Sequence, residues 1–151
     1  SRSCQRLGRS RTRHARAAVV ATLISLAPAM VCADPATDYV LHCRGCHGPS
    51  GGGIPPEVPD LRRHLARFAA TERGRAFLVG VPGVAQADLD DERLAELLTW
   101  LVREMGRAPS APAFTVEEIA RLRRPPIVDV ARRRAEVMGA AGLSDGSYPS
   151  E

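Results

Sequence analysis

The stretch Cys43-Arg44-Gly45-Cys46-His47, followed by a glycine-rich segment, decides how this chain folds. On a helix, residues three apart share a face, so the thiols of Cys43 and Cys46 can both reach one edge of a flat macrocycle. His47 follows Cys43 by four residues on the same face, where its ring can bind a central iron atom. Cys-x-x-Cys-His is the attachment signature of c-type haem. The stretch therefore predicts one covalent haem c, with His47 as the proximal iron ligand.

Other chemistries also use a Cys-x-x-Cys pair. A thiol-disulfide redox site needs a strand before the motif within an alternating strand-helix pattern. Here the preceding residues 39–42 are few and look helical. A zinc site needs a second ligand pair, and downstream only His64 is available. A disulfide between Cys43 and Cys46 would close a loop too small to constrain the chain. We therefore take haem attachment as the prediction and keep a haem-free thiol-disulfide oxidoreductase as an alternative.

The positive charge of the sequence belongs to its first part. The 151 residues include 21 basic side chains, all of them arginine, and 17 acidic ones. Six arginines precede residue 17, whereas every acidic residue lies at or after Asp34. Beyond position 33 the net charge is therefore −2. This balance offers no basic surface for a nucleic acid, and we expect none as a partner.

Residues 1–33 have the three parts of an export signal in the right order. A basic segment is followed by the apolar residues 17–30, and Val31-Cys32-Ala33 provides small residues before a cleavage site. The apolar segment is interrupted by Pro28 and is shorter than the roughly 20 residues that span a bilayer. We expect cleavage after Ala33, a periplasmic location and no membrane span in the mature chain. The cysteines that remain are those of the motif, which suits an oxidising compartment.

The mature chain is predicted to be all-α. Asp34 and Pro35 begin a helix that leads into the motif, on which Tyr39 and Val40 are expected in the core. A loop over 48–59 precedes a helix over 60–70, and 71–75 is expected to break that helix before a short apolar segment. Asp90 caps a last helix. Its buried face is predicted to contain Leu94, Leu97, Leu98 and Leu101.

Residues 106–151 form a C-terminal extension of different character. A proline-containing linker over 107–113 is followed by Thr115-x-x-Glu118, which predicts a capped helix that ends before Pro125. A second short helix is expected over 127–138. The end of the chain, 139–151, is expected to be disordered.

The region 34–105 resembles a small class I cytochrome c. The matching features are the motif, the glycine loop, the prolines after it and a final helix that contains Trp100. The resemblance implies a helical domain around one covalent haem, which carries single electrons and is not an enzyme. It also implies redox partners, namely a periplasmic dehydrogenase and an oxidase or another cytochrome. In the family a proline carbonyl accepts the second ring N–H of the proximal histidine, a place open here to Pro55, Pro56 or Pro59.

The sixth iron ligand is where the chain departs from this family. Class I cytochromes usually supply a methionine from the loop before the last helix, but 81–87 contains neither methionine nor histidine. His64 is the protein candidate, and an open or water-bound position and Met138 are the alternatives. Met105 is expected in the core. An open position would favour gas sensing or peroxide chemistry over electron transfer.

Overall fold

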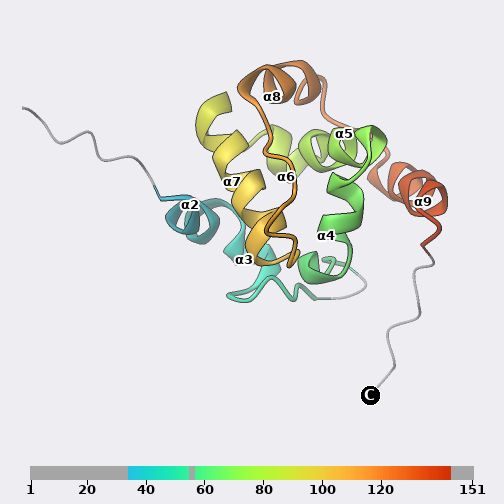
Figure 1. Cartoon of the computed structure of the whole chain (residues 1–151), viewed down its shortest axis with the longest axis horizontal. Coiled ribbons are helices and arrows are strands. Elements are labelled where there is room, and N and C mark those ends of the chain that lie inside the picture. Colours follow the sequence, from blue (N-terminus) through green and yellow to red (C-terminus); the bar gives the residue numbers. More distant parts are fainter. Residues whose placement is uncertain (1–33, 55–56, 144–151) are drawn as a thin grey trace, which may run out of the picture. The chain divides into compact units, whose positions relative to one another are not determined.

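The computed structural model describes residues 34–54 and 57–143, and this part of the chain is all-α apart from an isolated antiparallel bridge between Ile54 and Val58. The expected export signal over 1–33 and the last residues, 144–151, lie outside the described residues. Figure 1 shows the helices of the described part. Their bounds are Pro35–His42 (α2), Arg44–His47 (α3), Leu61–Ala69 (α4), Glu72–Gly80 (α5), Pro82–Ala85 (α6), Asp91–Glu104 (α7), Val116–Leu122 (α8) and Val130–Ala140 (α9).

Side-chain caps fix where most of the long helices begin. The Asp60 carboxylate accepts a hydrogen bond from the Arg62 amide at 2.9 Å, and that of Asp90 accepts one from the Arg93 amide at 2.8 Å. Asp34 caps α2 in the same way. Each bond satisfies an amide that has no partner inside its helix. The predicted starts of these three helices are confirmed.

The start of α5 corrects the sequence prediction. Residues 71–75 were expected to break the chain, but Thr71 caps a new helix by accepting a hydrogen bond from the Gly74 amide at 3.1 Å. A Cβ atom on Gly74 would lie 2.1 Å from the Phe68 carbonyl oxygen, so only glycine lets α5 start so close to the end of α4. The break is therefore limited to Ala70 and Thr71.

The last helix of the predicted domain, α7, forms the centre of the core. Its four predicted leucines are all buried. Helix α7 contacts both α2 and α4, and Figure 1 shows it running between them. At the crossing with α2 the rings of Tyr39 and Trp100 lie 6.0 Å apart. The prediction for Val40 is wrong, because 49% of it is exposed while its neighbours Asp38 and Tyr39 occupy the face of α2 that is buried.

The extension packs on the preceding helices. Helix α8 contacts α5 and α7, and α9 contacts α5. Its buried apolar side chains join the same core cluster, and they are Phe114, Ile119, Val137 and Met138. Helix α9 starts three residues later than predicted and continues to Ala140, inside the segment that was expected to be disordered. Among the described residues, no helix is long and apolar enough to span a bilayer.

Candidate functional site

The five-residue motif lies where α2 ends and α3 begins. Cys43 separates the two helices with φ −122° and ψ −37°, and its amide still donates to the Tyr39 carbonyl at 2.9 Å. The His47 amide donates in turn to the Cys43 carbonyl at 3.0 Å, so the backbone stays close to helical. Neither thiol is in a disulfide; Cys43 is half-buried and Cys46 is exposed. The two thiols and the imidazole therefore come from one continuous turn.

The orientation of His47 is fixed by the loop that follows it. The Nδ1 atom lies 3.1 Å from the carbonyl oxygen of Pro59. A carbonyl only accepts, so Nδ1 carries the proton and Nε2 keeps its lone pair for a metal. Burial lowers the pKa of His47, and the bond to Pro59 opposes that effect. Of the three prolines left open by the sequence, the structure places Pro59 here; Pro55 and Pro56 lie outside the described residues.

Glycines allow the loop to fold back beneath the histidine. The Gly53 amide donates to the His47 carbonyl at 2.9 Å, and Gly53 has a positive φ of 67°. A Cβ atom at this position would lie 2.2 Å from the Val58 carbonyl oxygen and 2.7 Å from that of Pro59. The hydroxyl of Tyr39 also donates to the Gly48 carbonyl and ties the loop to α2. The glycine run thus serves to bring the Pro59 carbonyl to the imidazole.

The electrostatics of Cys43 do not suit thiol-disulfide chemistry. Burial, aided by the negative charges of Asp38 and Cys46, raises the pKa of the Cys43 thiol to about 11. Thiol oxidoreductases depend on a thiolate with a lowered pKa. The structure also gives no support to the zinc reading, because no group of three or more His, Cys, Asp or Glu side chains gathers to hold a metal ion within the described ranges.

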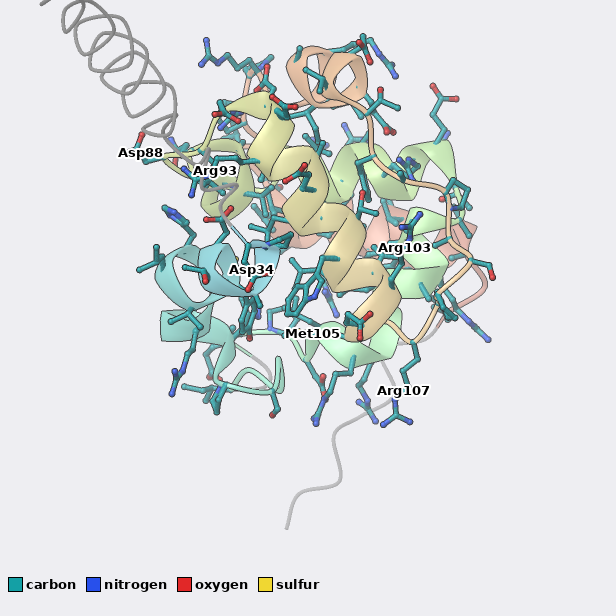
Figure 2. The ribbon with its side chains drawn as sticks, turned by 60° about the vertical axis from the view of Figure 1, so that its left-hand side comes forward. Asp34, Asp88, Arg93, Arg103, Met105 and Arg107 are labelled. Atoms are coloured by element: carbon teal, nitrogen blue, oxygen red, sulfur yellow. The ribbon has the colours of Figure 1, made fainter. Side chains whose placement is uncertain are left out.

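The candidates for a sixth ligand lie on different elements. His64 is half-buried on α4, and its ring stacks on that of Phe68 with centroids 5.9 Å apart. Met105 lies at the lower end of α7 in Figure 2, and its Sδ would be only 2.8 Å from a Cβ on Gly51, so it packs against the loop that follows His47. Met138 is buried in the core cluster. Both methionines therefore make packing contacts with the described part of the chain.

The segment before α7 is held by one arginine of the extension. Arg123 is 6% exposed, and its guanidinium donates to the carbonyls of Ala85, Ala87 and Leu89 at 3.0 to 3.3 Å. It also donates to the Asp91 carboxylate at 2.6 Å. In the class I resemblance this segment supplies the methionine ligand, whereas here 81–87 contains no methionine and Arg123 holds the backbone. We call Arg123 and these four acceptors the Arg123 clamp.

Comparison with known proteins agrees with this geometry. A cytochrome c-552 from Thermus thermophilus is 33% identical to the chain over 116 residues, which cover 63% of this chain and 78% of the relative. A second cytochrome c-552 from Thermus thermophilus is 33% identical over 112 residues, which cover 60% of this chain and 85% of the relative. This chain belongs to the class I c-type cytochromes. No protein-family profile matches the sequence of this cytochrome.

The residues of this cytochrome fit the haem c of its family. Two thiols not in a disulfide stand three residues apart. The imidazole beside them is held at Nδ1, which leaves the lone pair of Nε2 to bind an iron atom. Sequence reasoning did not single out Asp38, five residues before Cys43, or its partner Arg93, whose side chain meets it at 2.5 Å. They are 55 positions apart, and no spacing rule joins them. The one sequence signal for this pair was the position of Asp38 directly before Tyr39, a residue that was expected in the core.

Proposed function

We propose that this c-type cytochrome is an exported one-electron carrier with a single haem c, attached through Cys43 and Cys46 and bound at the iron by His47. When bound, haem c supplies one-electron exchange at its iron. The protein's part is to hold the group, orient the ligand and limit access of water. The contact between His47 Nδ1 and the Pro59 carbonyl carries the proposal, because it presents Nε2 in one orientation.

The partners and location follow from the same proposal. The three-part leader over 1–33 supports export to the periplasm with cleavage after Ala33. A carrier there exchanges electrons with other redox proteins, and we propose a dehydrogenase as donor and an oxidase or another cytochrome as acceptor. We also propose 34–105 as the cytochrome domain and 106–151 as its C-terminal extension, with the bounds that the sequence predicts.

The attachment is tested by expression in a host that matures c-type cytochromes. Intact-mass measurement of the wild type is expected to show one haem added and the leader removed. Cys46→Ser should leave at most one thioether, and His47→Ala should alter the haem absorption bands while keeping the added mass. His42→Ala, in a half-buried histidine just before the motif, is the matched control and should change neither. A colourless wild-type protein with two titratable thiols would contradict the proposal.

The sixth position separates the carrier from a second candidate function. We propose His64 as the sixth ligand, supported by its place on α4 soon after the motif and by its stacking on Phe68. The alternative is an open position that binds a gas or peroxide, and the absence of methionine and histidine from 81–87 favours it. Ferrous wild-type protein that does not bind carbon monoxide, with binding restored in His64→Ala, supports His64. Carbon monoxide binding by the wild type supports the open position.

A further inference from the structure

An ion pair with a buried carboxylate lies between the haem-attachment helix and the core helix. The Asp38 carboxylate on α2 is 1% exposed, and Arg93 on α7 donates to it from Nη2 at 2.5 Å. Figure 2 shows Arg93 at the end of α7 that faces α2, with Asp88 and Asp34 nearby. Such a pair is costly to bury unless both charges are compensated.

The carboxylate of this pair is also close to the Cys43 thiol. Asp38 precedes Cys43 by five residues, about 7.5 Å of helical rise. The charge on Asp38 contributes to the raised pKa of the Cys43 thiol, so the two side chains interact across this short distance. Asp88 and Asp90 add further negative charge around Arg93. The helix that leads into the attachment motif therefore carries a buried carboxylate, and the Arg93 guanidinium is paired with it.

We propose, resting on the haem attachment proposed above, that Asp38 and Arg93 are positioning residues of opposite effect on the haem reduction potential. Reduction of the iron removes one positive charge from the group. A nearby carboxylate therefore favours the oxidised form and lowers the potential, whereas a nearby guanidinium favours the reduced form and raises it. Burial strengthens the effect of Asp38, because water screens its charge less than that of the more exposed Arg93.

The test is the midpoint potential of holo-protein variants, measured by spectroelectrochemical titration at pH 7. Asp38→Asn is expected to raise the potential and Arg93→Gln to lower it. Arg93→Lys keeps the charge and should return the potential close to that of the wild type. A purely structural role predicts shifts in the same direction for the first two variants, because loosening the α2–α7 contact lets water toward the haem in both.

The matched control is another ion pair of the same length. Glu118 and Arg75 meet at 2.5 Å between α8 and α5, and α8 lies at the end of the helical body away from α3 (Figure 1). Glu118→Gln should lower stability without moving the potential. Thermal melts show whether each variant is folded. If Asp38→Asn does not fold, comparison of Arg93→Gln with Arg93→Lys still tests the inference. Shifts of equal sign, or none, overturn the inference. A wild type without haem overturns the proposed function as well, so the two failures are distinguishable.

Discussion

At the scale of single residues, the site depends on backbone that only glycine can supply. His47 is oriented by the Pro59 carbonyl, and that carbonyl is within 2.7 Å of where a Gly53 side chain would begin. Gly53 also donates to the His47 carbonyl. One residue thus supports the ligand from two directions, although it carries no chemistry of its own.

Gly53→Ala is therefore expected to destabilise the protein. The positive φ and the clash with the Val58 and Pro59 carbonyls together predict a loss of about 2–4 kcal/mol in the free energy of unfolding. Gly45→Ala is the control: it lies within the motif on α3, with nothing inside 4 Å of the new Cβ, and should change stability by less than about 1 kcal/mol. Urea unfolding of both variants measures the difference. Equal stabilities would show that the loop relaxes freely.

At the scale of elements, α8 is fixed to α5 by an ion pair that also contacts an aromatic ring. Arg75 donates to both carboxylate oxygens of Glu118, and its guanidinium lies 3.7 Å from the centre of the Phe114 ring. The Glu118 amide meanwhile donates to the Thr115 hydroxyl at 3.2 Å. The predicted capping box is therefore half formed, because the Glu118 side chain turns to Arg75 and not back to its own helix.

The stability that this pair provides should depend on pH. The Arg75 guanidinium holds the pKa of Glu118 below its ordinary value of 4.5, so the pair contributes fully above that value and is lost as pH falls through the lowered folded-state pKa. Glu118→Gln should cost about 1–3 kcal/mol at pH 7. The cost should shrink below about pH 4.5. Urea unfolding across this range is the measurement, with the exposed Glu96→Gln as the control. A cost that is constant with pH would exclude the ionic explanation.

Sequence patterns within a few residues predicted where helices begin better than they predicted which residues the helices bury or contact. Asp34, Asp60 and Asp90 mark helix starts from sequence because a cap bonds within three residues. Thr71 was missed as a cap because 71–75 was expected to be a break, whereas Gly74 within it allows α5 to pack closely on Phe68. Val40 was placed in the core because helical spacing does not say how wide the buried face is. The proline that holds His47 and the Asp38–Arg93 pair depend on tertiary distances, which the sequence does not contain.

At the scale of the whole molecule, the extension is part of the packed domain. Ile119 on α8 is fully buried, and α9 contributes Val137 and Met138 to the same cluster. The Ile127 amide donates to the Gly80 carbonyl at 2.8 Å, which adds a backbone link to α5. The Arg123 clamp joins the extension to the segment before α7. The tail is therefore more than a linker with two independent helices.

Loss of the clamp should weaken the whole domain. Arg123→Met keeps the length of the side chain but leaves three carbonyls and the Asp91 carboxylate without their donor, so we expect a loss of about 3–5 kcal/mol. Arg124→Met changes the adjacent, exposed arginine and should stay within about 0.5 kcal/mol of the wild type. Thermal or urea unfolding compares the two. Equal effects would mean that Arg123 contributes no more than a surface charge.

If the chain is exported as proposed, with its N-terminus first, the clamp would also order the steps of folding in time. Arg123 follows His47 by 76 residues, so both thiols emerge well before the guanidinium that closes the segment at Ala85 to Asp91. A maturation enzyme that joins the porphyrin vinyl groups to these sulfurs would meet an open chain during translocation. On this proposal, the arrival of the extension would then complete the fold around a cofactor that is already bonded.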